Sequence, residues 1–168
     1  TYVPDGYTAL YDAVGCSINQ LKKEVLEDLE AKKAAIVVTI FTDGKENNSK
    51  EFSDLADLVK ILEDIQDTGL WTVNLVGCDL KTFDLARSLK IKAANTMQYS
   101  QGSVGTEKAM RGLARSSALY SSNVQSMGIA GAASLDYLSA VEEDDDIKIG
   151  SDTEAEDTSL GQTEDSES

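Results

Sequence analysis

A helical pattern opens the chain, with apolar residues at intervals of three or four that would share one face of a helix. These residues are Leu10, Val14, Ile18, Leu21 and Val25. Thr8 stands just before them, where a hydroxyl can accept a hydrogen bond from the backbone and cap the helix. A second helical face is formed by Phe52, Leu55, Val59, Leu62 and Ile65. Gly69 follows it at a position typical of a helix C-cap.

Short continuous apolar runs predict the strands. Residues 34–41 are Ala-Ala-Ile-Val-Val-Thr-Ile-Phe, a β-branched run typical of a strand buried on both faces of a parallel sheet. Residues 71–77 and 95–99 predict two further strands, with a short helix at residues 79–89 between them. Strands that alternate with helices are typical of α/β folds with right-handed crossovers. We therefore expect a Rossmann-like, mostly parallel sheet with flanking helices.

The pattern weakens towards the C-terminus. A last helix is predicted at residues 106–119, with Met110, Leu113 and Ala114 facing inward. Residues 121–140 are rich in Ser, Ala and Gly, which indicates a linker after a folded part at residues 1–120. Residues 141–168 hold 12 acidic residues against one lysine and few apolar residues, so we expect a disordered acidic tail.

Composition and charge exclude several functional classes. The formal net charge is −15, which disfavours nucleic acid as a partner. The chain has no histidine, so Ser-His-Asp and Cys-His catalysis are excluded, and any bound metal would be held by oxygen. No apolar run approaches the roughly 20 residues that a membrane span needs. Cys16 and Cys78 form neither a disulfide framework nor a zinc spacing, and two free thiols favour a cytoplasmic location.

Two polar loops carry the candidate chemistry. One precedes the first helix and contains Thr8, and the other follows the first strand and contains Asp43. Ligands of open α/β sheets bind at the carboxyl ends of strands, and hydroxyl and carboxylate oxygens suit Mg²⁺. Taken singly, Thr8 is better explained as a helix cap and Asp43 as a turn former before Gly44. Taken as a pair, they favour a metal site.

The same loops resemble a known family. The pattern Pro4-x-Gly6-x-Thr8-x-Leu10-x-Asp12-Ala13 resembles the second metal loop of von Willebrand factor A-type domains. Thr42-Asp43-Gly44, followed by Glu46-Asn47, resembles the third metal loop, and single-domain bacterial members carry similar runs. A predicted helix and a buried strand separate the two motifs, as in the family. The resemblance covers roughly residues 1–120.

The resemblance implies a Rossmann-like domain with a metal-ion-dependent adhesion site. Such a site holds Mg²⁺ or Mn²⁺ and binds a protein partner whose carboxylate completes the coordination. By resemblance, Thr8 is the threonine ligand and Asp43 is the acid of the third loop. Bacterial relatives often work beside ATPases, kinases or phosphatases, so a partner of these kinds is implied.

One part of the family pattern is absent from the sequence. The first metal loop, Asp-x-Ser-x-Ser, occurs nowhere in the chain. We therefore expect this loop and its strand to lie upstream of Thr1 in a longer protein. With two ligands of about five, the chain alone is expected to hold metal weakly or not at all.

Two alternative functions stay open. An enzyme of phosphoryl transfer would use Asp43 as its nucleophile or Mg²⁺ ligand. Phosphatases of that type place a second acid two residues later, where this chain has Lys45, and no phosphate-binding glycine-rich loop is present. The other alternative is a degenerate structural module without metal. We expect a binding module rather than an enzyme.

Overall fold

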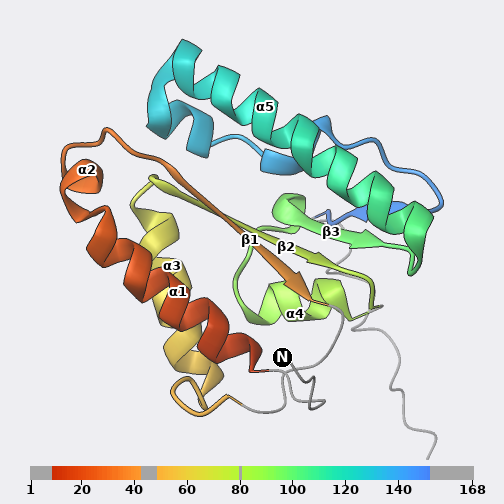
Figure 1. Cartoon of the computed structure of the whole chain (residues 1–168), viewed down its shortest axis with the longest axis horizontal. Helices are drawn as coiled ribbons and strands as arrows, with labels where there is room; N and C mark the ends of the chain where they lie inside the picture. Colours follow the sequence, from red (N-terminus) through yellow and green to blue (C-terminus); the bar gives the residue numbers. More distant parts are fainter. Residues whose placement is uncertain (1–8, 43–48, 80, 152–168) are drawn as a thin grey trace, which may run out of the picture.

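The computed structural model describes residues 9–42, 49–79 and 81–151 (Figure 1). Its elements in chain order are α1 (Leu10–Glu24), α2 (Leu26–Glu30), β1 (Ile36–Thr42), α3 (Leu55–Asp67), β2 (Trp71–Gly77), α4 (Thr82–Ser88), η1 (Ala93–Asn95), β3 (Thr96–Tyr99), α5 (Ser103–Ala133), η2 (Tyr137–Ala140) and β4 (Ile147–Ile149). They form one four-stranded sheet of order β1-β2-β3-β4. The first three strands are parallel and β4 is antiparallel to β3, which confirms the predicted α/β class with a mostly parallel sheet.

Helices cover both faces of this sheet. Helices α1, α3 and α4 pack on one face, where Ile18, Leu62 and Val73 are fully buried in the larger apolar core. Helix α5 and η2 cover the opposite face, above a smaller core that includes Val76 and Met97 (Figure 1). Because side chains alternate along a strand, β2 supplies residues to both cores and is buried along its whole length.

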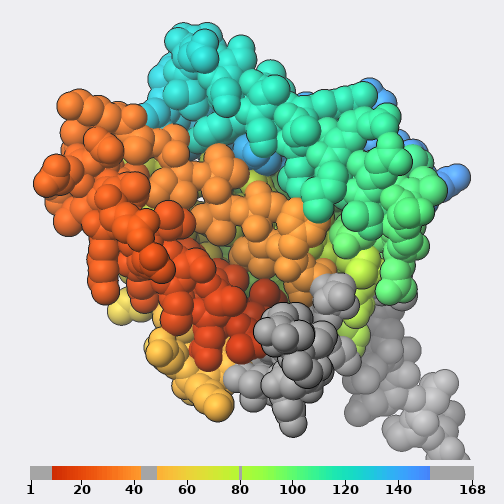
Figure 2. Space-filling model, in the orientation of Figure 1, coloured from red at the N-terminus to blue at the C-terminus, as the bar shows by residue number. Residues whose placement is uncertain are grey.

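Strand β1 lies at one edge of the described sheet. It pairs with β2 from Ile36 to Thr42, and only Ile40 in it is buried. Phe41 is 41% exposed. Atoms of β1 reach the surface between α1 and α5 (Figure 2). The prediction that residues 34–41 are buried on both faces is therefore wrong here, because an edge strand leaves one side open.

The predicted caps concern the start of α1 and the end of α3. The N-cap of α1 is Ala9, which makes no side-chain cap bond, whereas the predicted cap Thr8 lies outside the described residues. Helix α3 begins after Asp54, whose carboxylate accepts from the N–H of Ala56 at 2.9 Å. Gly69 follows α3 with a positive φ of 66°, so the predicted C-cap is confirmed.

Helix α5 is much longer than predicted and runs through most of the predicted linker. It continues to Ala133, with non-helical geometry at Gly128. Its middle is held by η2, since the Tyr120 and Tyr137 ring centroids are 5.6 Å apart and the Ser117 and Tyr137 hydroxyls are 2.7 Å apart. Residues 121–133 are helical except at Gly128, and their many Ser, Ala and Gly residues hid this from the pattern.

The inward face of α5 is made of small residues. The residues Gly105, Ala109, Gly112 and Ser116 are buried. Met110 and Ala114 are exposed, so their predicted inward placement is wrong, whereas Leu113 is partly buried against the smaller core. A β-carbon on Gly112 would lie 3.2 Å from the methyl groups of Val141. Small side chains therefore let the segment after η2 approach the helix closely.

The first part of the predicted acidic tail is folded. Residues 141–151 are described, and they include β4. The expectation of disorder is wrong for this part, because its carboxylates find cationic partners on α5. Residues 152–168 lie outside the described residues, and the division of the chain into domains stays a prediction. Within the ranges given above, no helix combines the length and apolar content needed to cross a bilayer.

Candidate functional site

The two predicted metal ligands, Thr8 and Asp43, both lie outside the described residues. Their immediate surroundings are described. Strand β1 ends at Thr42, directly before Asp43, and α1 begins at Leu10, two residues after Thr8. Figure 1 shows the start of α1 on the side of the sheet towards which β1 points. The start of α1 and the carboxyl end of β1 therefore lie on the same side of the molecule.

Asp12 ties these two regions together. Its carboxylate accepts hydrogen bonds from the backbone N–H groups of Lys50, Glu51 and Phe52, at 2.8, 3.0 and 2.8 Å. The N–H of Asp12 in turn donates to the hydroxyl of Ser49 at 3.0 Å. Asp12 belongs to the first turn of α1, and residues 49–52 directly follow the loop that contains Asp43. This Asp12 clamp fixes the end of that loop against the start of α1.

Packing beneath the clamp reinforces it. Phe52 is buried, and its ring lies where a side chain on Gly15 would otherwise stand, since a β-carbon there would be 2.3 Å from the ring. Gly15 thus lets the segment after the loop lie close to α1. Asp12 belongs to the motif that resembles the second metal loop, but nothing in the sequence indicated that it forms this clamp. The pairing of Asp12 with residues forty positions away has no signal in local periodicity.

The strand beside β1 also ends in an acidic residue. The carboxylate of Asp79, two residues after β2, accepts from the N–H of Lys81 at 2.8 Å. Its carbonyl accepts from the hydroxyl of Thr82 at 2.6 Å. A β-carbon on Gly77 would lie 2.4 Å from that hydroxyl, so glycine is needed for the close turn into α4. Asp79 is thus a turn-forming acid. The end of β2 that precedes it lies beside the end of β1, because Gly77 pairs with Thr42.

The described side chains do not form a metal site by themselves. In the part of the chain that the structure describes, no group of three His, Cys, Asp or Glu side chains is placed to hold a metal ion. The carboxylates of Asp12 and Asp79 are engaged with backbone N–H groups.

The order of the described strands contains no switch point. Ligand crevices in open α/β sheets form where the strand order reverses. The described strands β1, β2 and β3 follow one another in a single direction, without a reversal. A crevice of that kind would need a further strand beside the open edge of β1.

Cys16 lies beside the Asp12 clamp and is not an activated thiol. Its Sγ donates to a carboxylate oxygen of Glu51 at 3.1 Å. This hydrogen bond raises the pKa of the Cys16 thiol, with further contributions from desolvation and from the negative charges of Glu51 and Asp12. A protonated thiol is a poor nucleophile.

Comparison with protein-family models, with curated proteins and with solved structures finds no match to this chain. The resemblance to von Willebrand A-type domains therefore stays a prediction. The helix and the strand expected around the motifs are present, since α1 begins within the first motif at Leu10 and β1 ends at Thr42, the first residue of the second.

Proposed function

We propose that this chain is a divalent-metal-dependent protein-binding module with a Rossmann-like, von Willebrand A-like fold. Thr8 and Asp43 supply oxygen ligands to Mg²⁺ or Mn²⁺ at the carboxyl edge of the sheet. A carboxylate of a protein partner, of the ATPase, kinase or phosphatase kind, completes the coordination. The observation that carries this proposal is the Asp12 clamp, which joins the chain segments next to both loops.

The clamp supports the proposal because a metal site needs ligands whose supporting shell is fixed before the metal arrives. Both ends of the loop at residues 43–48 are anchored by described contacts. Thr42 pairs with Gly77 at one end, and Ser49 bonds to Asp12 at the other. Thr8 precedes the same turn of α1 that carries Asp12. This arrangement favours a shared role for the two loops over two unrelated turns.

The number of proposed ligands sets the expected affinity for metal. Mg²⁺ takes about six oxygen ligands and keeps several of them as water, and two protein ligands hold it weakly. We therefore expect weak metal binding by this chain.

A thermal unfolding experiment with matched variants tests the metal site. A ligand at ten times its Kd stabilises a folded protein by about 1.4 kcal/mol, so Mg²⁺ at tens of millimolar should raise the Tm of the full chain. Asp43→Asn should abolish the Mg²⁺-dependent part of this rise. Asp79→Asn removes the same charge from the neighbouring strand end and should leave the rise in place. An equal Mg²⁺ response in both variants would contradict the proposal, because it would indicate diffuse binding to the acidic chain.

A hydrolysis assay separates this function from phosphoryl transfer. We expect no turnover of a generic phosphate monoester with Mg²⁺. Turnover that Asp43→Asn abolishes would instead assign the chain to the phosphoryl-transfer class, with Asp43 as its central acid.

A further inference from the structure

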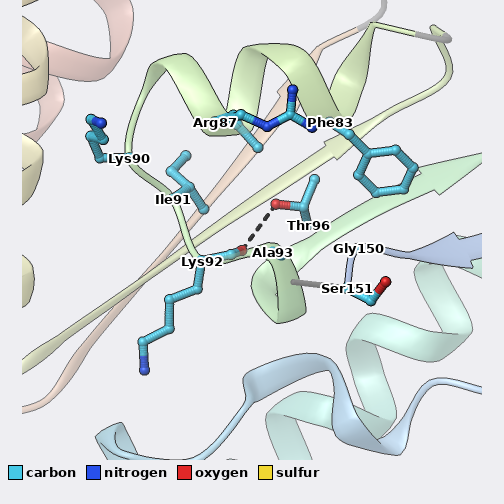
Figure 3. Close-up of a pocket in the computed structure, with 10 residues that line it drawn as sticks. Phe83, Arg87, Lys90, Ile91, Lys92, Ala93, Thr96, Gly150 and Ser151 are labelled. Carbon is cyan, nitrogen blue, oxygen red and sulfur yellow. Dashed lines mark hydrogen bonds between the residues drawn. The ribbon is translucent and has the colours of Figure 1, made fainter. Parts of the chain in front are cut away.

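A pocket lies away from the candidate metal loops, between α4, η1 and the start of β3. Its volume is about 340 Å³. Phe83 and Ile91 give it apolar walls, and Thr96 lies at its centre with its hydroxyl bonded to the carbonyl of Lys92 at 3.1 Å (Figure 3). Ser151, the last described residue, closes one side.

The rim of this pocket is basic. Arg87, Lys90 and Lys92 line it, and Figure 3 shows the Arg87 guanidinium extending towards Phe83. Arg87 pairs with Asp84 at 3.1 Å. Among the ion pairs of the described residues, none involves Lys90 or Lys92, and both side chains are exposed. The rim therefore carries two cationic groups whose charge no described partner offsets.

An acidic segment follows directly after Gly150 and Ser151, which line this pocket. The N–H of Gly150 donates to the carbonyl of Thr96 at 3.0 Å. This bond holds the chain beside the pocket just before residue 152. Residues 152–168 contain seven acidic residues and no basic one. A flexible stretch of ten residues has a root-mean-square reach of about 17 Å, and tethered groups reach millimolar effective concentrations.

We propose that the pocket is the docking site of the chain's own acidic segment at residues 152–168. Carboxylates of this segment pair with Lys90 and Lys92, and the segment covers the apolar walls formed by Phe83 and Ile91. Exposed ion pairs are individually weak, so the tether is what makes this contact form. A separate acidic peptide would have to displace the segment before it could enter the pocket.

The same chain already uses this type of contact once. The acidic run just before β4 is held on α5 by Lys108, which bonds to both Asp144 and Asp146, and by Arg115, which bonds to Glu142. Composition alone indicated disorder for this run, yet cationic partners on a neighbouring helix hold it in place. The segment at residues 152–168 continues this acidic character next to a second basic group.

Amide spectra of the full chain test the proposal. The comparison is between the natural chain and a variant in which the seven acids of residues 152–168 are replaced by their amides. At low ionic strength, the two should differ in the backbone amide shifts of Lys90 to Ala93, about sixty positions from the substitutions. This difference should vanish at 1 M salt, where the screening length falls to about 3 Å.

Matched lysine variants decide where the segment docks. In a Lys90→Gln, Lys92→Gln background, the difference between the two tails should be lost. In a Lys22→Gln, Lys23→Gln background, which removes two lysines from α1, it should persist. The proposal is overturned if the amides of Lys90 to Ala93 are the same with either tail, or if the α1 pair abolishes the difference as fully as the pocket pair does.

Discussion

The carboxylate of Asp12 accepts a hydrogen bond from the backbone N–H of Phe52 at 2.8 Å, across forty positions of the sequence. Two neighbouring N–H groups bond to the same carboxylate. A short segment after the strand-end loop is therefore held on the first turn of α1 by one charged side chain. This relationship joins the chain segments next to the two candidate ligand loops.

Replacing Asp12 should loosen this junction. Asp12→Ala removes the acceptor for three N–H groups and should lower the free energy of unfolding by about 1–2 kcal/mol, since two of those groups remain accessible to water. Asp12→Asn retains one acceptor oxygen and should cost less. Denaturant unfolding measures both values. Equal stability of Asp12→Ala and the natural chain would show that the clamp contributes nothing.

The ion cluster between α5 and the segment before β4 predicts a pH dependence. The Lys108 ammonium lies 2.6 Å from carboxylate oxygens of both Asp144 and Asp146, and these hydrogen bonds lower the pKa of both acids. A lowered pKa means that the contribution to stability is present above about pH 3.9, the ordinary value in an unfolded chain. It is lost as the pH falls through the lower folded-state pKa. Carboxyl titration by NMR should place both midpoints below 3.9.

A lysine variant provides the control for that titration. Lys108→Met removes the cation but keeps most of the side-chain length. The pKa values of Asp144 and Asp146 should then rise, because the Lys108 hydrogen bond is the main cause of their lowering. Midpoints that stay unchanged in Lys108→Met would show that the cluster does not hold this segment.

Close packing on α5 gives a third prediction. Gly112→Val should overpack the contact with Val141 and cost about 1–3 kcal/mol, because even a β-carbon alone would lie 3.2 Å from the Val141 methyl groups. Ala114→Val places the same side chain on the exposed face of the helix and should cost only about 0.5 kcal/mol. Thermal unfolding of the two variants gives the comparison. Similar losses in both would mean that Val141 is not packed on the helix.

The open edge of β1 predicts self-association of the chain. An unpaired apolar edge strand is a template for pairing with another chain, and a lysine on such an edge opposes it. The natural chain should therefore form concentration-dependent oligomers, and Phe41→Lys should reduce them, since Phe41 is 41% exposed on this strand. Sedimentation analysis measures the mass. A natural chain that stays monomeric and unfolds cooperatively at high concentration would contradict this prediction.

Large apolar residues made much of the fold predictable. The strand at residues 71–77 was placed to the residue, because a fully buried strand has a continuous apolar run. The third strand was placed within one residue of β3. The strand at residues 34–41 was located within two residues of β1, but its burial was overestimated, because a run of apolar residues does not reveal whether a neighbouring strand is present on each side.

The C-terminal part was predicted poorly for an equally physical reason. Helix α5 packs through glycine, alanine and serine, and these residues carry no hydrophobic periodicity. The acidic residues before β4 are ordered by Lys108 and Arg115, which stand about thirty to forty positions earlier in the sequence. Composition describes a segment by itself, whereas these contacts depend on a helix that folds against it.

The candidate site was predicted in part. The motif residues Thr8 and Asp43 lie outside the described residues, so their role as metal ligands stays a prediction. Their approach to one another is supported by Asp12, which belonged to the quoted motif although no function had been assigned to it. A long-range bond between a side chain and the backbone leaves no periodic signal, so only the folded chain reveals it.

Paramagnetic broadening by Mn²⁺ tests the central claim most directly, because it detects weak binding and shows where the ion resides. In amide spectra of the full chain, added Mn²⁺ should broaden the signals of Thr42 and Ser49 to Phe52 before those of α5. Asp43→Asn should remove this local broadening, whereas Asp79→Asn should preserve it. Broadening that spares Thr42 and Ser49 to Phe52, or that survives Asp43→Asn, would contradict a metal site between these loops.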